Sequence, residues 1–220
     1  MDILKIKLVV FDLDGVLVDA CEWHRVALNK ALKEISGYEI SLEDHHKEFN
    51  GIPTKVKLNK LVEKKIVQQQ DIEKIEQLKQ IKTIELINSQ AFIRHEKIEL
   101  ISFLKQKQIK VACYTNSIRV TAELMLKKTG ILELFDLLIT NQDVTVPKPN
   151  PEGYIKCMDH FKIDSRNCLI VEDSPKGIEA ARNSGAEVLV VYNQNDVTKD
   201  TFLTEVKLYE DSYSNGGRRK

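Results

Sequence analysis

The sequence predicts an α/β fold built on a doubly wound parallel sheet. Short apolar runs rich in β-branched residues recur along the chain, as expected of strands that are buried on both faces. Helical patterns separate these runs, and strands alternating with helices form right-handed crossover units. The predicted strands cover residues 8–11, 110–114, 168–171 and 188–191, and a weaker pattern covers 135–139.

Two of the predicted helices carry their own start and stop signals. Residues 118–129 show a helical pattern that ends at Gly130, a residue that readily takes the left-handed conformation found after helices. Residues 175–184 follow Ser174 as N-cap and have proline at the first helical position. In a sheet of this kind, ligands bind at the carboxyl ends of the strands.

The long interval between the first two predicted strands indicates an inserted domain. The first strand ends near residue 12 and the next begins near 110, whereas a parallel crossover needs only about a dozen residues or slightly more. The segment between them is rich in Lys, Glu, Gln, Leu and Ile, and apolar residues recur at near-helical spacing over 72–84. We predict a core of residues 1–18 and 95–211, a helical cap of 19–94, and a disordered polar tail of 212–220.

The composition limits the classes of partner. The 220 residues include 33 Lys and Arg and 33 Asp and Glu, so no net field attracts nucleic acid or an anionic membrane. The four cysteines show no CxxC spacing, and no apolar run is long enough for a signal peptide or a bilayer span. We therefore expect a cytoplasmic protein with neither nucleic-acid nor membrane partners. We also expect a monomer, because the cap shows no unpaired apolar seam.

A pair of carboxylates follows the first predicted strand. Asp12 and Asp14 lie at i and i+2 in Phe11-Asp-Leu-Asp-Gly15, so both project to the same side of an extended segment. Like charges this close need a counter-ion, and carboxylate oxygens suit Mg²⁺, which also binds substrate phosphate. The alternative is a solvated turn with two ordinary aspartates.

Polar residues also follow the second predicted strand, and a lysine lies further along the chain in Val-Pro-Lys-Pro-Asn150. Thr115 and Asn116 can bind phosphate oxygens at the start of a helix, and Ser117 either does the same or caps that helix. Lys148 lies between two prolines that restrict its loop, so it offers a fixed positive charge unless it is an ordinary surface lysine.

These segments resemble, in order, the four motifs of the haloacid dehalogenase superfamily. The matching residues are FDLDGVLVD at 11–19, Thr115, Lys148, and Glu172 with Asp173. The resemblance covers nearly the whole chain and implies a Rossmann-like core with a helical cap inserted after the first strand. Within the superfamily, the position of the insert and the run at 19–24 look like the branch that contains β-phosphoglucomutase, phosphoglycolate phosphatase and sugar-phosphate phosphatases.

The resemblance implies a Mg²⁺-dependent phosphatase acting on a small phosphorylated metabolite. Asp12 would attack phosphorus to form an aspartyl phosphate that water then hydrolyses, with Asp14 acting first as acid and then as base. The implied metal ligands are Asp12, Asp173 and the backbone carbonyl of Asp14, with Glu172 binding directly or through water. Asp173 can also cap the helix that follows it.

Cap residues and two alternatives remain open. His24 matches a hinge histidine of the mutase, although a lone histidine early in a helix is commonly a surface residue. The mutases carry an arginine shortly after the glycine of a cap loop, whereas this chain reads Gly51-Ile-Pro-Thr-Lys55, which favours a phosphatase with Thr54 and Lys55 as candidate substrate contacts. The alternatives are a sugar-phosphate mutase of the β-phosphoglucomutase type and a non-catalytic binding module on the same fold.

Overall fold

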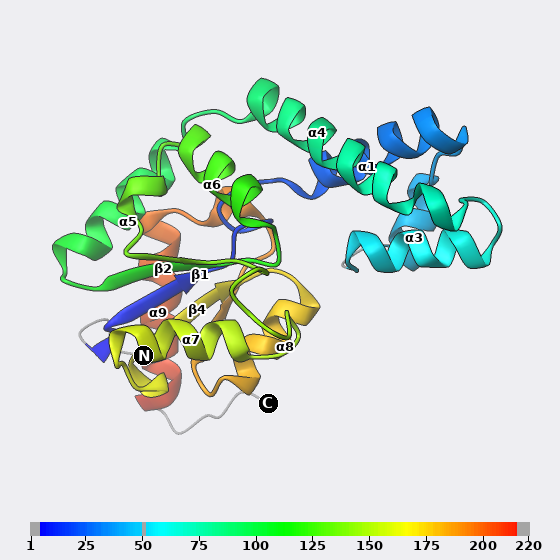
Figure 1. Cartoon of the computed structure of the whole chain (residues 1–220). Coiled ribbons are helices and arrows are strands. Elements are labelled where there is room, and N and C mark those ends of the chain that lie inside the picture. The colour runs from blue at the N-terminus through cyan, green and yellow to red at the C-terminus, as the bar shows by residue number, and fades with distance from the viewer. Residues whose placement is uncertain (1–4, 50–51, 215–220) are drawn as a thin grey trace. The chain divides into compact units, whose positions relative to one another are not determined.

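The computed structural model describes residues 5–49 and 52–214, and it divides the chain into two compact units (Figure 1). The first unit comprises Met1–Asp19 and Phe92–Lys220, and the second comprises Ala20–Ala91. The cap bounds of 19–94 expected from the sequence differ from this division by one residue at the start and three at the end. The second unit is thus an insert between the first strand and the rest of the core.

Within the described part of the first unit, five strands form one parallel sheet. The strands are β1 (Leu8–Phe11), β2 (Lys110–Tyr114), β3 (Leu137–Ile139), β4 (Cys168–Glu172) and β5 (Glu187–Val190). Their order is β3-β2-β1-β4-β5, so β1 lies at the centre and Val10 pairs with Ala112 on one side and Ile170 on the other. The predicted α/β fold with a doubly wound parallel sheet is confirmed.

The helices of this unit follow the strands as the sequence predicts. They are α5 (His95–Gln106), α6 (Arg119–Lys128), α7 (Glu152–Phe161), α8 (Pro175–Asn183) and α9 (Lys199–Ser214). Short 3₁₀ turns occur at Leu132–Leu134, Ser165–Asn167 and Gln194–Asp196. The backbone N–H of Gly177 donates to the Ser174 hydroxyl at 3.2 Å, which makes Ser174 the N-cap of α8.

The last helix extends into the segment expected to be a disordered tail. Helix α9 continues to Ser214, so the first three residues of the 212–220 segment are helical. Phe202 and Val206, four residues apart on one face of the helix, are both buried and hold it against the core. Once the helix has formed there, each added residue gains a backbone hydrogen bond, so the helix extends toward its C-terminus. The remainder of that segment, 215–220, lies outside the described residues.

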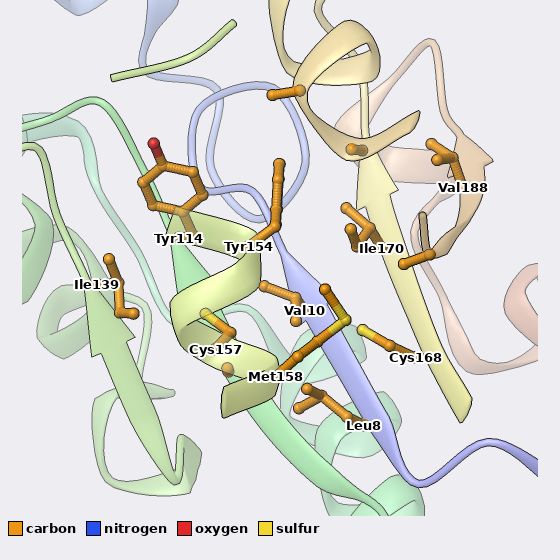
Figure 2. Packing of buried hydrophobic residues seen from close by; sticks show 14 residues of the cluster. Leu8, Val10, Tyr114, Ile139, Tyr154, Cys157, Met158, Cys168, Ile170 and Val188 are labelled. Carbon is orange, nitrogen blue, oxygen red and sulfur yellow. The ribbon is translucent and has the colours of Figure 1, made fainter. Parts of the chain in front are cut away.

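Helices α7 and α8 cover one face of the sheet. Figure 2 shows Leu8, Val10 and Ile170 of the central strands packed with Cys157 and Met158 of α7. Burial of a large apolar side chain contributes about 1.5–3 kcal/mol relative to leaving it exposed, so this layer stabilises the sheet strongly. The packing leaves the carboxyl ends of β1, β2 and β4 at a common edge.

All the regular secondary structure described in the second unit is helical. It contains α1 (Cys21–Ser36), α2 (Leu42–Asp44), a π-helical turn (His45–Phe49), α3 (Thr54–Glu63), a 3₁₀ turn (Gln69–Asp71) and α4 (Ile72–Gln90). Its core includes Leu32, Leu61 and Ile75, whereas Ile81 is exposed although it belongs to the apolar pattern at 72–84. None of the helices described in either unit is both long and apolar enough to cross a membrane.

Candidate active site

The residues singled out at strand ends meet at the carboxyl edge of the sheet. Asp12 follows β1 and its N–H donates to the carbonyl of Val171 at 3.0 Å, while the N–H of Thr115, after β2, donates to the carbonyl of Ile139 at 3.0 Å. Asp173 directly follows β4. Because parallel strands all point the same way, these three positions lie along one edge, and their side chains can converge on one ligand.

Lys148, in the loop before α7, reaches this edge with a buried side chain. Its Nζ lies 2.5 Å from Oδ1 of Asp12, 2.6 Å from Oε1 of Glu172 and 3.1 Å from the backbone carbonyl of Tyr114. An ammonium group has three hydrogens, and here each has an acceptor. Burial and these contacts show that Lys148 is not a surface lysine.

The carboxylates that surround Lys148 at this edge carry more negative charge than its ammonium can balance. Burial raises the pKa of Asp12, and the nearby Glu172 and Asp14 raise it further, against the opposing charge of Lys148. Burial also disfavours the ammonium of Lys148, but the attraction of Asp12 and Glu172 outweighs it and keeps the pKa of Lys148 well above its usual value. One lysine therefore faces several carboxylates, and an additional cation would relieve their repulsion.

Glu172 is held by hydrogen bonds on both of its carboxylate oxygens. Its Oε1 accepts from Lys148 and, at 2.8 Å, from the hydroxyl of Tyr154, while its Oε2 accepts from the backbone N–H of Asp173 at 2.9 Å and of Ser174 at 3.2 Å. Attraction to Lys148 and the hydrogen bonds outweigh burial and lower the pKa of Glu172. The carboxylate thus remains ionised, at the N-terminal end of α8 where negative charge is favoured.

Three carboxylates form a candidate cation site. Asp12, Glu172 and Asp173 each offer an oxygen, and these oxygens lie within 4.8 Å of one another. Oδ1 of Asp173 is buried and has no hydrogen-bond partner within the described residues, and burial raises the pKa of Asp173 to about 6. Gly15, with φ of 92°, brings its backbone so close that a Cβ atom would lie 2.1 Å from Oδ2 of Asp173. An all-oxygen set with one such oxygen fits a hard divalent cation.

Ser117 contacts Asp14 instead of capping a helix. Its hydroxyl donates to Oδ2 of Asp14 at 2.9 Å, and its backbone N–H donates to Oγ1 of Thr115 at 3.0 Å. The N-cap position of α6 belongs to Ile118, whose side chain makes no capping bond. The capping alternative for Ser117 is therefore wrong, because the hydroxyl is directed at the half-buried Asp14.

Asn116 joins two loops with its side chain. Its Oδ1 accepts from the backbone N–H of Lys148 at 3.2 Å, and its Nδ2 lies 3.4 Å from the Lys148 carbonyl. A phosphate contact from this amide, as expected from the sequence, would require it to give up one of these interactions. In the structure Asn116 fixes the loop that carries Lys148.

The candidate substrate contacts of the cap belong to the second unit. His24 lies in α1, and its Nδ1 is 3.3 Å from Nζ of Lys79 in α4. Thr54 is the first residue of α3 and is half-buried, and Lys55 is exposed. The glycine at position 51 lies outside the described residues. Roles for His24, Thr54 and Lys55 in substrate binding stay predictions.

Two tyrosines that were not expected at the site lie beside Lys148. The rings of Tyr114 and Tyr154, labelled in Figure 2, meet edge to face with centroids 4.9 Å apart. Nζ of Lys148 lies 4.7 Å from the ring centroid of Tyr114 and 5.0 Å from that of Tyr154. A cation near aromatic faces is stabilised by the ring quadrupoles. Gly153 makes room for this arrangement, since a Cβ atom there would lie 2.2 Å from Cζ of Tyr114. The proximity of Tyr114 to Thr115 and of Tyr154 to Lys148 in sequence was the available signal.

Comparisons with known proteins agree with this fold. A family model described as haloacid dehalogenase-like hydrolase matches residues 9–191. A phosphorylated carbohydrates phosphatase from Thermotoga maritima is 27% identical over 193 residues, which cover 86% of this chain and 87% of that protein.

Two solved structures show the same architecture. One is a predicted phosphoglycolate phosphatase from Haemophilus somnus, with a TM-score of 0.78 and 20% identity over 93% of this chain and 98% of that one. The other is a β-phosphoglucomutase from Clostridium difficile, with a TM-score of 0.75 and 21% identity over the same shares, 93% and 98%. At these identities the likeness shows the Rossmann-like fold with its cap.

Proposed function

The chain belongs to the haloacid dehalogenase-like hydrolase family, and we propose on this basis that it is a Mg²⁺-dependent phosphatase acting on a small phosphomonoester. The buried contact of Asp12 with Lys148 carries this proposal. It places a carboxylate and a fixed positive charge together at the carboxyl edge of the sheet. Phosphoryl transfer depends chiefly on such positioning and on neutralising the charge of the phosphoryl oxygens.

Asp12 and Asp173 would hold Mg²⁺ directly, together with the backbone carbonyl of Asp14. Glu172 would contribute through water, because both of its oxygens already accept hydrogen bonds. When bound, Mg²⁺ neutralises the clustered carboxylates and the charge on substrate phosphate. The oxygen of Asp173 that lacks a hydrogen-bond partner among the described residues supports this assignment.

The residues of the chain then divide the chemistry between them. A carboxylate oxygen of Asp12 attacks phosphorus as the ester bond breaks, and the leaving oxygen takes the proton of Asp14. Asp14, now ionised, accepts a proton from water, and that water attacks the phosphorus of the aspartyl phosphate. The second step releases inorganic phosphate and restores Asp12. Thr115 and Lys148 hold the phosphoryl oxygens during both steps.

We propose a sugar phosphate or a similar metabolite as substrate. The name of the Thermotoga maritima relative, a phosphatase of phosphorylated carbohydrates, supports this class. His24, Thr54 and Lys55 remain the candidate substrate contacts in the cap, and Ser117 is one in the core. A cytoplasmic location and a monomeric state, which rest on the sequence alone, complete the proposal.

Phosphate release from an aryl phosphate and a panel of phosphorylated metabolites tests this function. Each assay is run with Mg²⁺ or with a chelator, for the wild type, for Asp12→Asn, and for Asp159→Asn as a control at an exposed position of α7. We expect turnover that requires the metal and is lost in Asp12→Asn but kept in Asp159→Asn. Metal-dependent turnover that survives Asp12→Asn would remove Asp12 from its role as nucleophile.

The same panel separates a phosphatase from a mutase. A mutase transfers the phosphoryl group of the aspartyl phosphate to a sugar hydroxyl instead of water, and it depends on a sugar bisphosphate. We expect free phosphate to accumulate without added bisphosphate. Isomerised sugar phosphate appearing only with bisphosphate would favour the mutase.

A further inference from the structure

Tyr154 and Lys148 donate to the same oxygen of Glu172. The hydroxyl of Tyr154 lies 2.8 Å from Oε1 of Glu172, and Nζ of Lys148 lies 2.6 Å from that oxygen. Tyr154 and Glu172 are fully buried, so solvent does not compete for either contact. The hydroxyl of Tyr154 is thereby connected through Glu172 and Lys148 to Asp12.

A phosphoryl group must compete for the ammonium of Lys148. Its three hydrogens are directed to Asp12, to Glu172 and to the backbone carbonyl of Tyr114. A phosphoryl oxygen that binds Nζ has to share one of these hydrogens or displace an acceptor. The strength with which Glu172 holds the ammonium therefore affects how much of its charge is available beside Asp12.

The hydroxyl of Tyr154 weakens the hold of Glu172 on Lys148. A hydrogen bond donated to a carboxylate stabilises its negative charge and makes that oxygen a weaker acceptor for its other donors. Glu172 cannot compensate by turning, because its Oε2 accepts from the backbone N–H groups of Asp173 and Ser174. Without the hydroxyl, Oε1 would draw the ammonium toward Glu172 and away from Asp12.

We propose that Tyr154 is a positioning residue of the phosphoryl-transfer site, whose hydroxyl keeps the ammonium of Lys148 available to Asp12 and to the phosphoryl group. The inference rests on the proposed phosphatase function. The aromatic ring has a separate role, since it packs edge to face against Tyr114 beside Lys148. Phenylalanine would keep that ring, so Tyr154→Phe removes the hydroxyl alone.

Steady-state kinetics and vanadate binding of Tyr154→Phe test the inference. We expect kcat to fall about ten-fold and KM to change less than about two-fold, because the ammonium matters most when charge shifts in the transition state. Orthovanadate mimics the geometry of phosphoryl transfer, and its affinity, measured by calorimetry with Mg²⁺, should fall by a similar factor. The thermal unfolding midpoint should fall only slightly, as expected from the loss of one buried hydrogen bond.

Two further tyrosine variants provide controls. Tyr192→Phe alters a side chain that is 93% exposed and should match the wild type in every measurement. The hydroxyl of Tyr114 is buried and has no hydrogen-bond partner within the described residues, so Tyr114→Phe should lower kcat less than Tyr154→Phe does. Equal losses in Tyr114→Phe and Tyr154→Phe would overturn the inference.

Failure of the inference can be distinguished from failure of the proposed function. If the wild type shows metal-dependent turnover that requires Asp12 while Tyr154→Phe keeps the wild-type kcat, only the inference is wrong. If the wild type is inactive on the whole panel, the proposed function fails. The vanadate titration then tests the role of Tyr154 by itself. Equal vanadate affinity in the wild type and Tyr154→Phe, or no vanadate binding, would then overturn the role of Tyr154.

Discussion

Gly177, in the first turn of α8, lies directly against the buried carboxylate of Glu172. A Cβ atom at Gly177 would lie 1.8 Å from Oε1 of Glu172, which is far inside any allowed contact. That oxygen is held by Lys148 and Tyr154, so the carboxylate has little freedom to move. The absence of a side chain at Gly177 is therefore a condition for burying Glu172 beneath α8.

Gly177→Ala should destabilise the protein although alanine favours helices. We expect the free energy of unfolding to fall by about 1–3 kcal/mol, the usual range for overpacking a filled interior. Urea denaturation measures the change, with Glu179→Ala at an exposed position of α8 as the control. Wild-type stability of Gly177→Ala would contradict the fixed placement of Glu172.

Asp173→Asn should separate metal binding from folding. Asp173 crowds other carboxylates and its Oδ1 has no hydrogen-bond partner within the described residues, so removing its charge should not lower stability without metal. Mg²⁺ should raise the thermal unfolding midpoint of the wild type, since a ligand that binds only the folded state stabilises it. We expect this increase to vanish in Asp173→Asn. An undiminished increase would mean that Mg²⁺ binds elsewhere.

Asn116→Ala should impair activity more than stability. The amide of Asn116 is exposed, and its two contacts fix only the backbone of Lys148, so we expect a loss of about 1 kcal/mol or less in unfolding free energy. A looser Lys148 loop should nevertheless lower kcat several-fold, because misplaced groups reduce phosphoryl transfer strongly. Asn183→Ala, at the exposed end of α8, serves as the control. Unchanged kcat in Asn116→Ala would contradict this role.

Lys97 should make stability depend on pH in the alkaline range. Burial, aided by the charge of Arg94, lowers the pKa of Lys97 from its ordinary 10.5 to about 8. Below about pH 8 the lysine is protonated in both states, and the folded state bears the cost of a buried charge. Between about pH 8 and 10.5 the unfolded chain binds more protons, so this group's contribution to stability rises with pH.

Comparing the wild type with Lys97→Met isolates this effect. The neutral amine keeps two N–H groups for the carbonyls of Gln194 and Val197, so the folded contacts survive deprotonation. The stability of the wild type relative to Lys97→Met should increase by on the order of 2–3 kcal/mol from pH 8 to 10.5. Denaturant titrations across that range measure it, with the exposed Lys127→Met as the control. A constant difference would refute the buried charge.

Much of the fold could be predicted from local patterns. Apolar runs gave the positions of β1, β2 and β4 to within a residue, and Ser174 with Pro175 marked the start of α8, because these signals depend only on neighbouring residues. The ends of elements were less predictable. Helix α9, for example, runs to Ser214 because its buried face stabilises it. Burial was also harder to predict, since Ile81 belongs to the apolar pattern of α4 but is exposed.

Local sequence patterns were enough to place residues at the carboxyl edge of the sheet, because parallel strands bring their ends to one edge whatever the details of packing. The contacts of those residues could be seen only in the folded chain. Asp12 and Lys148 are 136 positions apart, and Ser117 is directed at Asp14 across 103 positions. Such contacts depend on the directions of side chains from separate elements, which local sequence patterns do not encode. For the same reason the role of Tyr154 became visible only once α7 and β4 were packed together.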